Sequence, residues 1–451
     1  MTLPQHLQTD PPRPRGLSLA EALEERERLG RPVRVGLVGA GQMGTDIIVQ
    51  TAQMPGIEIV AVADIAPDRV TEAVAMTDRK GLVGTATTEA ELTRLHGAGR
   101  IAATPDLKLV CNAQEIDVII DATGNPEAGA RVALAAIHAR KHIVMMNVEA
   151  DVTIGSYLAE EAAKADVVYT LGAGDEPAAA MELVRFIRTM GYPIVAAGKG
   201  KNNPFRIDAV PSQYTEEARR RNMNPRMLVE FVDGSKTMVE MVAIANACGF
   251  VPDVPGMHGP AAPRERLQDF FCPQEDGGLL SRKGVVDFSV AKGVAPGVFA
   301  IAEMRHPRVR ERMADLNLGP GPYYTFLRPY HLTSLEVPLS AAAAVVFGES
   351  HMRPLAIPTA EVGCVAKRNL ELGETLDAIG EYAYRGLALR KADAEARRAL
   401  PIGLAQGARV TRPVRKGELI TLADAEPNAA SSIVNVRHLQ DEMIAARRAL
   451  A

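Results

Sequence analysis

Short apolar runs alternate with amphipathic stretches between residues 33 and 171. The apolar runs predict strands at 33–38, 57–63, 118–121, 142–146 and 167–171. Helices are predicted where apolar residues recur every three or four positions, at 45–53, 87–95, 129–139 and 152–164. Regular alternation of strand and helix is typical of βαβ units on a parallel sheet. The pattern therefore predicts an α/β fold with an N-terminal, doubly wound Rossmann sheet.

The pattern changes on both sides of this region. Residues 1–16 are proline-rich and polar, and Ser18 with Glu21 forms a capping box that opens a helix ending at Gly30. A less regular stretch runs from 193 to about 347, and short β-like stretches lie at 360–370 and 404–419. We predict four parts: an arm and helix (1–30), a dinucleotide-binding Rossmann domain (31–174), an α+β substrate domain (175–350), and a small β domain with a C-terminal helix (351–451).

The composition is that of an ordinary globular protein of 451 residues, with 47% hydrophobic and 24% charged residues. Its 51 Lys and Arg nearly balance its 55 Asp and Glu, and aromatic residues make up 4% with no Trp. Such a chain lacks the basic excess and the stacking surfaces of a nucleic-acid-binding protein. We expect a small-molecule substrate as its partner and no nucleic acid.

Neither the cysteines nor the apolar runs indicate export or membrane insertion. The four cysteines lie far apart without a CxxC unit, as expected of thiols in a reducing compartment. No run of about 18 apolar residues is available to span a membrane, and residues 1–16 lack the apolar core of a signal peptide. We predict a cytoplasmic protein without a membrane partner.

A glycine-rich loop follows the first predicted strand. Its residues fit the pattern G-x-G-x-x-G and are Gly39, Ala40, Gly41, Gln42, Met43 and Gly44. The loop ends a strand and begins a helix, which is the context in which this pattern binds dinucleotides. The first glycine then allows a tight turn, the second allows the pyrophosphate to approach, and the third allows close packing of helix on strand. We predict that this loop binds NAD or NADP.

Polar residues at the ends of later strands extend the predicted cofactor site. Asp64 ends the second strand, where an acid binds the adenosine ribose and repels a 2′-phosphate, so it favours NAD. Arg69 could partly reverse that preference, and Asp64 could also be a turn residue. Two further loops follow strands at the same edge of the sheet and predict a nicotinamide rim, with ordinary turn chemistry as the alternative. The rim residues are Thr123, Gly124, Asn147 and Glu149.

The segment GKGKNNP at 198–204 combines charge with small residues. Lys199 and Lys201 offer point charges for a phosphate or carboxylate, and Asn202 and Asn203 could orient that group by hydrogen bonds. The glycines would let a ligand come close. We predict Lys199 in catalysis and the other three residues in substrate binding, with a solvated basic turn as the alternative.

An apolar helix is predicted to begin at Asp233 and to end near Cys248. Lys236 and Glu240 lie on this helix, whose other residues are apolar on nearly every face, so the helix is predicted to be buried. Buried charges need partners. We predict that Lys236 and Glu240 pair with each other and are catalytic, with an exposed i,i+4 ion pair as the alternative.

Four further polar residues are candidates in the substrate domain. Asp175 and Glu176 open a helix, and with Glu149 they could hold a divalent cation that polarises a ketone, although Asp175 could instead be an N-cap. Arg328 could bind an anion, and His331 could donate a proton or be structural. We predict Asp175 and His331 in catalysis, Arg328 in substrate binding, and Asp175 and Glu176 as metal ligands.

Several longer segments resemble a known family. Between residues 31 and 426 they include GLVGAGQMGTDI, IIDATGNPEAG, HIVMMNVEADVTIG, LGAGDEPAAAMEL, GKGKNNP, EFVDGSKTMVEM, GMHGP and GPYYTFLRPYHLTSLEVP. The chain resembles the bacterial deoxyxylulose-phosphate reductoisomerase-like oxidoreductases, a branch of the homoserine dehydrogenase-like superfamily. Its tail resembles a SAF domain, a small β-clip module. The superfamily resemblance also implies that a lysine and acidic residues of the substrate domain take part in the reaction.

The resemblance implies a reaction of isoprenoid biosynthesis. In that reaction 1-deoxy-D-xylulose 5-phosphate is rearranged and reduced with NADPH to 2-C-methyl-D-erythritol 4-phosphate. Asp64 does not fit the use of NADPH, because its carboxylate favours NAD. We therefore predict an NAD(P)-dependent oxidoreductase of the EC 1.1.1 type, a homo-oligomer that acts on a small polar, phosphorylated, sugar-like substrate. Two alternatives stay open: a homoserine or sugar-acid dehydrogenase without rearrangement, and a non-catalytic NAD-binding sensor or scaffold.

Overall fold

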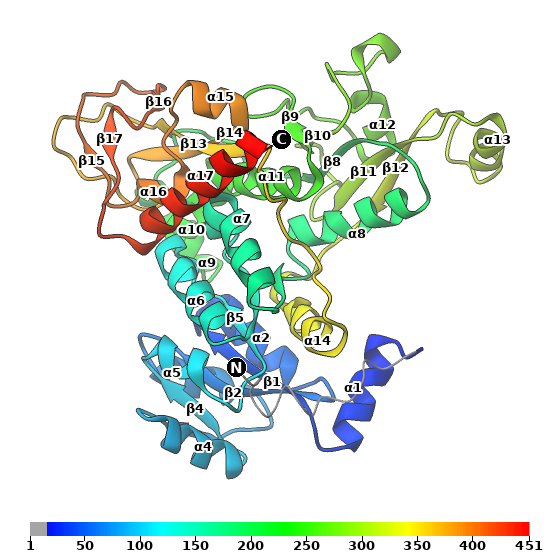
Figure 1. Ribbon diagram of the computed structural model, residues 1–451. Helices are drawn as coiled ribbons and strands as arrows, with labels where there is room; N and C mark the ends of the chain where they lie inside the picture. The colour runs from blue at the N-terminus through cyan, green and yellow to red at the C-terminus, as the bar shows by residue number, and fades with distance from the viewer. Residues whose placement is uncertain (1–15, 451) are drawn as a thin grey trace. The chain divides into compact units, whose positions relative to one another are not determined.

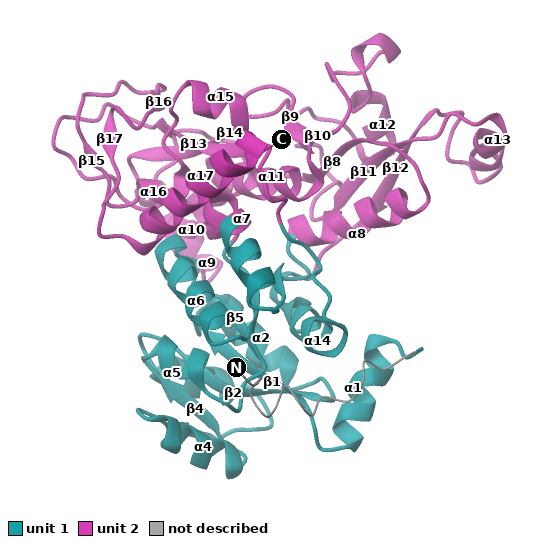
Figure 2. Ribbon diagram, in the orientation of Figure 1, with its two compact units in different colours: residues 1–147, 157–175, 332–353 teal, residues 148–156, 176–331, 354–451 magenta. Residues whose placement is uncertain are grey.

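The computed structural model describes residues 16–450, so all but the last residue of the predicted N-terminal arm lies outside the described residues. The chain forms two compact units, each assembled from segments that are far apart in the sequence (Figure 2). Unit 1 contains the described residues up to 147 together with 157–175 and 332–353. Unit 2 contains 148–156, 176–331 and the described residues from 354 onward. The predicted boundaries at 174 and 350 thus lie close to two points where the chain changes unit.

Unit 1 is built around a seven-stranded parallel sheet with the strand order β3-β4-β2-β1-β5-β6-β7 (Figure 1). Its strands are β1 (Val33–Val38), β2 (Ile57–Ala63), β3 (Val83–Thr85), β4 (Ile101–Thr104), β5 (Val118–Asp121), β6 (His142–Met145) and β7 (Tyr169–Leu171). The strand order reverses at β1, beside β5, and doubly wound folds bind ligands beyond the carboxyl ends of the strands at such a point. The predicted Rossmann sheet is confirmed.

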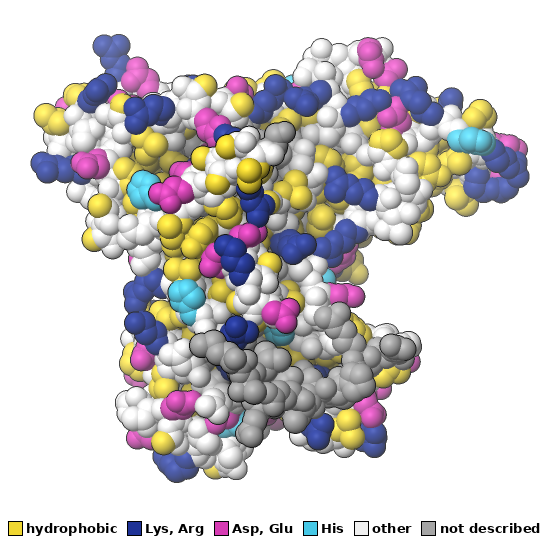
Figure 3. Space-filling model, viewed as in Figure 1, with side chains coloured by type: hydrophobic (Ala, Val, Ile, Leu, Met, Phe, Trp, Pro, Cys, Tyr) yellow, Lys and Arg dark blue, Asp and Glu magenta, His cyan; other side chains and the backbone are white. Residues whose placement is uncertain are grey.

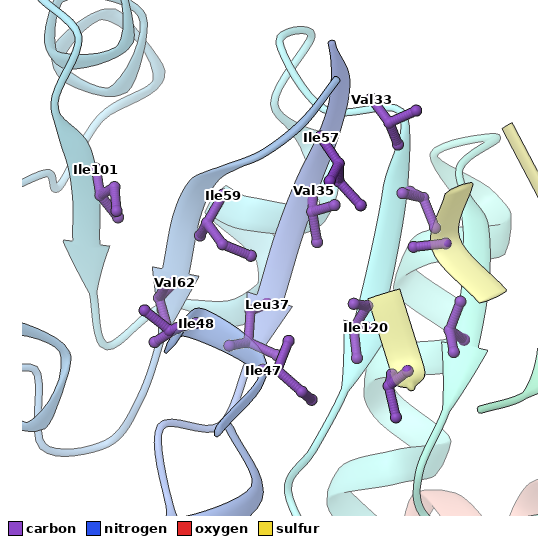
Figure 4. Close-up of a cluster of buried hydrophobic side chains, with 14 of the residues drawn as sticks. Val33, Val35, Leu37, Ile47, Ile48, Ile57, Ile59, Val62, Ile101 and Ile120 are labelled. Atoms are coloured by element: carbon purple, nitrogen blue, oxygen red, sulfur yellow. The ribbon is translucent and has the colours of Figure 1, made fainter. Parts of the chain in front are cut away.

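The centre of this sheet is buried because its strands are apolar on both faces. Val33, Val35 and Leu37 of β1 are fully buried, and β1 pairs in parallel with β2 on one side and β5 on the other. Figure 4 shows these side chains close to Ile57 and Ile59 of the neighbouring strand. A rigid core therefore lies directly below the glycine-rich loop that follows β1.

Helices connect the strands of unit 1. They are α1 (Leu19–Arg28), α2 (Gln42–Thr51), α3 (Asp68–Val74), α4 (Glu89–Gly97), α5 (Leu107–Asn112), α6 (Pro126–His138) and α14 (Val337–Phe347), which follows the short 3-10 helix η4 (Thr333–Leu335). Helix α7 (Val148–Lys164) begins in unit 2 and ends in unit 1. The capping box predicted for α1 is present, since Ser18 Oγ accepts from the Glu21 N–H and Glu21 Oε2 accepts from the Ser18 N–H.

Helix α14 completes the Rossmann unit although it lies nearly two hundred residues beyond the first part of that unit. Its Val337, Ala341 and Ala342 belong to the same buried cluster as the side chains of β1. The sequence pattern gave no reason to assign these residues to the N-terminal domain. Their apolar surface is covered only when residues 332–353 return to the sheet.

Unit 2 contains a five-stranded mixed sheet in the order β12-β11-β8-β10-β9. Its strands are β8 (Ile194–Gly200), β9 (Val251–Pro252), β10 (Val285–Ser289), β11 (Val298–Glu303) and β12 (Tyr323–Arg328). Two helices, α8 (Glu176–Thr189) and α11 (Ser235–Cys248), pack on this sheet. Its shorter helices are η1 (Pro211–Gln213), α9 (Thr215–Arg220), α10 (Pro225–Val232), η2 (Arg264–Arg266), α12 (Leu267–Phe270), η3 (Gln274–Asp276) and α13 (Pro307–Asp315).

The C-terminal segment adds two small antiparallel sheets to unit 2. One has the order β14-β13-β16 and the other pairs β15 with β17. Their strands are β13 (Ala360–Ala366), β14 (Tyr384–Arg390), β15 (Arg409–Val410), β16 (Leu419–Ile420) and β17 (Ala425–Glu426), and the helices are α15 (Lys391–Ala396), α16 (Ile402–Ala405) and α17 (Ser432–Leu450). The tail therefore has the predicted β character, and its likeness to a SAF module stays a prediction.

Helix α11 is buried because it contacts both the five-stranded sheet and the strands β13 and β14 of the tail. Every residue from Ser235 to Cys248 except Lys236 is buried. The prediction of a helix buried on nearly every face is thus correct. Because the tail supplies one side of that burial, residues from 354 onward are part of the packing of unit 2.

Buried ion pairs also join the tail to the rest of unit 2. Lys367 Nζ lies 2.6 Å from Oδ2 of Asp233, which lies between α10 and α11, and both side chains are almost fully buried. Glu361 Oε2 accepts from Lys391 Nζ at 2.8 Å and from an Arg437 guanidinium nitrogen at 2.6 Å. Because unpaired buried charges are costly, these contacts require tail and core to fold together.

The described residues contain no helix that could span a membrane and no disulfide. Among the helices of residues 16–450, none has the length and the apolar character needed to cross a membrane. All four cysteines are buried thiols. On the face seen in Figure 3, basic side chains lie among acidic and apolar ones.

Candidate active site

The glycine-rich loop has the geometry expected of a dinucleotide-binding loop. Gly39 follows β1 with a φ of +101°, and a Cβ there would lie 2.7 Å from the carbonyl oxygen of Ala122. A Cβ at Gly44 would lie 2.0 Å from the carbonyl oxygen of Gly39, so only glycine allows α2 to pack this closely. Around Gly41, which caps α2, the described residues leave the Cβ position open. The N-terminus of α2 is therefore open to a pyrophosphate, which fits a dinucleotide.

Asp64 lies at the end of β2 and its carboxylate is buried beside this loop. Its Oδ2 accepts from the Ala40 N–H at 2.7 Å, and its Oδ1 accepts from the Ala66 N–H at 2.8 Å. The guanidinium of Arg69 lies 3.8 Å from Oδ1, and the Arg69 side chain is half exposed. Asp64 thus fixes the loop and its own turn, and it places a negative charge where the cofactor's ribose is expected.

We expect Asp64→Ser to shift cofactor preference toward NADP(H). Removing the carboxylate removes the repulsion of a 2′-phosphate, while serine keeps a hydrogen-bond acceptor near Ala40. The ratio of the Kd for NADPH to that for NADH should fall by about tenfold, which corresponds to about 1.4 kcal/mol. Fluorescence titration of both reduced cofactors measures this without a substrate. The assignment of Asp64 is wrong if the wild type already prefers NADPH strongly, in which case Arg69 dominates and Arg69→Ser should abolish that preference.

The predicted nicotinamide rim is organised by hydrogen bonds within unit 1. Thr123 follows β5, and its N–H and Oγ1 donate to Asp121 Oδ1 at 3.0 and 2.7 Å. Asn147 follows β6 and donates through Nδ2 to the carbonyl oxygen of Asn125 at 2.7 Å, and Gly124 has a φ of +64°. These loops lie at the carboxyl edge of the parallel sheet, as predicted. Their contact with nicotinamide stays a prediction.

In unit 2, Lys199 lies inside strand β8 rather than on the predicted turn. In the register of the sheet, Val298 of β11 pairs with Lys199 on one side and with Arg328 of β12 on the other. Directly paired residues point to the same face, so Lys199 and Arg328 lie in one row, about 10 Å apart at the backbone. The row is on the face that carries α8, because both side chains contact acids of that helix.

The two glycines beside Lys199 serve packing. A Cβ at Gly198 would lie 1.8 Å from the carbonyl oxygen of Asp287 in β10, and a Cβ at Gly200 would lie 2.1 Å from the nitrogen of Ala295. The expectation that these glycines let a ligand approach is therefore wrong. They let neighbouring backbone approach β8, and they hold Lys199 on the opposite face.

Lys199 forms ion pairs with acids from two helices. Its Nζ lies 2.6 Å from Oε1 of Glu176, in the first turn of α8, and makes a shorter contact with Oε2 of Glu240 on α11. The side chains of Lys199 and Glu240 are 7% and 1% exposed. Burial lowers the pKa of Lys199, but the charges of Glu176 and Glu240 outweigh burial and raise the pKa above its usual value. Lys199 is therefore a permanent cation at neutral pH.

His331 and Arg328 both contact acids of helix α8. His331 Nε2 lies 3.3 Å from Glu176 Oε1, and the imidazole is largely buried. The guanidinium of Arg328 lies 3.0 Å from Oε2 of Glu182, further along α8. Asp175 directly precedes Glu176 in the chain, at the position before α8 begins. We call Lys199, Glu176, Glu240 and His331 the lysine cluster.

Lys236 has a different partner from the one predicted. Its Nζ lies 3.1 Å from Oε1 of Glu149, in the first turn of α7, whereas Glu240 contacts Lys199. The predicted Lys236–Glu240 pair is therefore wrong, because the two side chains leave α11 toward different elements. Glu149, which was assigned to the cofactor, belongs to unit 2.

Glu230 on α10 was missed by the sequence analysis. Burial, and then the charge of Glu149, raise the pKa of Glu230 to about 8, so that it holds a proton at neutral pH. Its Oε1 accepts from the Arg226 guanidinium at 2.9 Å. The i,i+4 spacing of Arg226 and Glu230 was the available signal, but that spacing is ordinary on exposed helices and does not indicate burial.

Lys201 is a desolvated cation rather than part of a solvated turn. It is 5% exposed, its Nζ donates to the carbonyl oxygen of Phe231, and it lies 5.7 Å from the ring centroid of Phe205. Burial, and then the nearby charge of Lys199, lower the pKa of Lys201 to about 8. Asn202 is exposed and Asn203 partly exposed, and Asn203 donates to the Asn202 side chain at 3.3 Å.

The geometry of the lysine cluster tests whether the predicted divalent metal ion fits this site. Asp175, Glu176 and Glu240 each offer a carboxylate oxygen, the ligand that Mg²⁺ prefers, and these three oxygens lie within 4.8 Å of one another. However, the ammonium of Lys199 contacts the carboxylates of Glu176 and Glu240 and occupies the position between them. A divalent cation bound to these two acids would lie against that ammonium and be repelled by it. The residues do not fit a divalent metal while Lys199 holds this position.

Two family models match separate parts of the chain. Residues 39–171 match the NAD-binding domain of homoserine dehydrogenase. Residues 174–337 match the catalytic domain of oxidoreductase DRL. No curated protein matches the chain. The first match covers the glycine-rich loop and the rim, and the second covers the lysine cluster.

Solved structures with related architecture are only distantly similar. A probable dehydrogenase from Thermotoga maritima is 15% identical over 60% of this chain and 72% of its own, with a TM-score of 0.35. Scyllo-inositol dehydrogenase from Lactobacillus casei with bound NAD(H) and scyllo-inositol is 15% identical over 60% and 73%, with a TM-score of 0.34. A DOX-P reductoisomerase in complex with magnesium is 16% identical over 72% and 71%, with a TM-score of 0.39. Similarity at this level says nothing about substrate.

Both family models describe domains of oxidoreductases, and together they support an oxidoreductase. Residues 39–171 are similar to the NAD-binding domain of homoserine dehydrogenase. Residues 174–337 are similar to the catalytic domain described for oxidoreductase DRL.

Proposed function

We propose that this protein transfers hydride between a nicotinamide dinucleotide and a small, polar, phosphorylated, sugar-like carbonyl compound. The lysine cluster carries the proposal, because it combines a permanent cation, two carboxylates and an imidazole in the part of the chain that matches an oxidoreductase catalytic domain. The resemblance to reductoisomerase-like enzymes supports the finer proposal of rearrangement and reduction of 1-deoxy-D-xylulose 5-phosphate to 2-C-methyl-D-erythritol 4-phosphate.

In this proposal unit 1 holds the cofactor. The N-terminus of α2 and the loop 39–44 bind the pyrophosphate, and Asp64 binds the adenosine ribose. Thr123, Gly124 and Asn147 line the nicotinamide. The bound nicotinamide supplies or accepts the hydride, and the remaining chemistry falls to side chains of unit 2.

Lys199 is proposed to polarise the carbonyl oxygen of the substrate. A donor aimed at the oxygen where negative charge develops is typically worth about 10²–10³ in rate. Because Glu176 and Glu240 raise its pKa, Lys199 keeps its proton and is a poor acid. Protonation of the oxygen is therefore assigned to His331, since imidazole is the side chain that titrates near neutral pH. Glu176 contacts both groups and holds them in position.

Lys201 and Arg328 are proposed to bind the phosphate of the substrate. Lys201 is desolvated, which strengthens its attraction for a dianion, and Arg328 can bind phosphate with two donors. Asn202 and Asn203 are proposed to orient the same group. Lys236, held by Glu149, is proposed as a second catalytic lysine.

We expect the KM for a phosphorylated substrate to rise as the pH increases through about 8. Below that pH the ammonium of Lys201 is charged and binds the dianion, and above it the charge is lost, because the pKa of Lys201 is lowered to about 8. Lys201→Ala should raise KM by about tenfold at pH 7, with little change in kcat, and remove the pH dependence. Lys201→Arg keeps the charge and should give a nearly flat profile. A wild-type KM that is constant from pH 7 to about 9 would contradict this role.

A panel of substrates tests the proposed function itself. The protein is assayed with NADH and with NADPH against keto-sugar phosphates, homoserine and sugar acids, and oxidation or reduction of the nicotinamide is followed by absorbance. Turnover confined to a phosphorylated keto sugar supports the proposal. Turnover confined to homoserine or a sugar acid favours the dehydrogenase alternative. Tight NAD(H) binding with no turnover on any compound favours the sensor alternative and refutes the proposal.

A further inference from the structure

The lysine cluster places a buried carboxylate and a partly buried one close together. The side chains of Glu240 and Glu176 are 1% and 14% exposed, and one oxygen of each lies within 4.8 Å of the other. Two carboxylates at this separation repel each other strongly in a medium of low dielectric constant. A pair of this kind requires a cation or a proton between its members.

The chain supplies that cation itself. Lys199 extends from β8, and its Nζ lies 2.6 Å from Glu176 and in still closer contact with Glu240. The alternation of side chains along β8 fixes this placement, because positions 198 and 200 face the other side of the sheet, where only glycine fits against neighbouring backbone. His331 adds a second nitrogen at 3.3 Å from Glu176. The ammonium thus occupies the place between the acids that a metal ion would otherwise take.

We propose that Lys199 is the resident cation of this site and takes the place of a divalent metal ion. The proposal deepens the proposed function, since it names the group that polarises the substrate in that same site. It has two consequences: the protein with Lys199 in place does not bind a divalent ion between Glu176 and Glu240, and removal of the lysine converts the acid pair into a divalent-cation site.

Binding of Mn²⁺ to the protein alone tests both consequences. Mn²⁺ is titrated into wild-type protein, Lys199→Ala and the double variant Lys199→Ala/Glu240→Gln, and free Mn²⁺ is measured by electron paramagnetic resonance. We expect no saturable binding to the wild type up to about 1 mM. Lys199→Ala should gain one Mn²⁺ site, with an affinity for Mn²⁺ at least about 100-fold higher than that of the wild type. The reason is that a repelling charge is removed and two carboxylates are released. Glu240→Gln in the double variant should abolish the gain.

Lys201→Ala is the matched control, since it removes another buried lysine two residues away whose Nζ donates to Phe231. It should gain no Mn²⁺ site. NADH binding and circular dichroism establish that each variant is folded, and Lys199→Gln, which keeps the length and a hydrogen-bond donor without the charge, replaces Lys199→Ala if that variant does not fold.

Two results would overturn the proposal. One is stoichiometric Mn²⁺ binding by the wild type that Glu240→Gln abolishes, which means that the metal displaces the ammonium. The other is a folded Lys199→Ala that binds no more Mn²⁺ than the wild type. Neither readout uses substrate or turnover, so failure of the substrate panel leaves this test intact, and success of the panel does not decide it.

Discussion

Lys199→Met is expected to lower kcat by about 10²–10³ while the Kd for NADH stays within about twofold of the wild type. Methionine matches the length of lysine but has no charge and no donor, so it can no longer polarise the carbonyl oxygen. The cofactor loop belongs to unit 1 and Lys199 to unit 2, which is why cofactor affinity should be unaffected. Steady-state kinetics on the substrate identified in the panel, with NADH fluorescence titration, measure both quantities.

Lys201→Met is the matched control for this prediction. It makes the same change two residues along the chain and also removes a buried lysine, yet it should act mainly on KM, because Lys201 is assigned to anchoring. The catalytic assignment of Lys199 fails if Lys199→Met folds and turns over at the wild-type rate. Equal loss of kcat in both variants would point instead to a general disturbance of the end of β8 and the residues that follow it.

Glu361→Gln is expected to lower the free energy of unfolding of unit 2 by about 3–5 kcal/mol. Glu361 is almost fully buried and accepts hydrogen bonds from Lys391 and Arg437, so its neutralisation leaves these two buried cations with only exposed carboxylates, Asp441 and Glu395, as counter-charges. Urea unfolding followed by circular dichroism measures the effect, since the chain has no Trp to serve as a fluorescent probe. Glu216→Gln is the control: it removes an exposed pair with Arg219 elsewhere in unit 2 and should cost at most about 1 kcal/mol.

The same carboxylate gives the stability of unit 2 a pH dependence of known sign. Burial raises the pKa of Glu361, but Arg437 and Lys391 outweigh burial and lower it below the usual value. A carboxyl group with a lowered pKa in the folded state stabilises the protein above its unfolded pKa of about 4.3, and this contribution is lost as the pH falls below that value. Wild-type protein should therefore lose stability on acidification below pH about 4.3 more steeply than Glu361→Gln. A Glu361→Gln variant with wild-type stability at neutral pH would contradict the role of this cluster.

The central strands of the Rossmann sheet could be predicted because their own residues determine them. Val33–Val38, Ile57–Ala63 and Val118–Asp121 are predominantly apolar runs with one charged residue each, and the predicted bounds agree with the structure. Strand β3 was missed because it is only three residues long and forms the sheet edge, and β4 was missed because its sequence, IAAT, has only one large apolar residue. The helix beginning at Pro126 was predicted three residues late, since Asn125 and Pro126 were interpreted as a turn rather than as the cap and first residue of α6.

The candidate site was predictable only in part, because charge pairing is a long-range property. The pattern of α11 correctly indicated that Lys236 and Glu240 are buried or nearly so, but their partners come from β8 and α7. Glu149 lies 87 residues before Lys236. Periodicity along one helix cannot identify such a partner. Likewise, a run of glycines and lysines resembles a turn, and only the pairing of β8 with β10 and β11 shows that Lys199 belongs to a strand.

The interrupted order of the two units has a consequence for biosynthesis. The first 147 residues leave the ribosome early, but the apolar face that α14 covers stays open until residue 353 has been synthesised. At roughly 5–20 residues per second, that interval lasts about 10–40 s. Unit 2 in turn cannot bury α11 until the tail strands have emerged. Both halves of the nascent chain therefore expose apolar surface for much of translation.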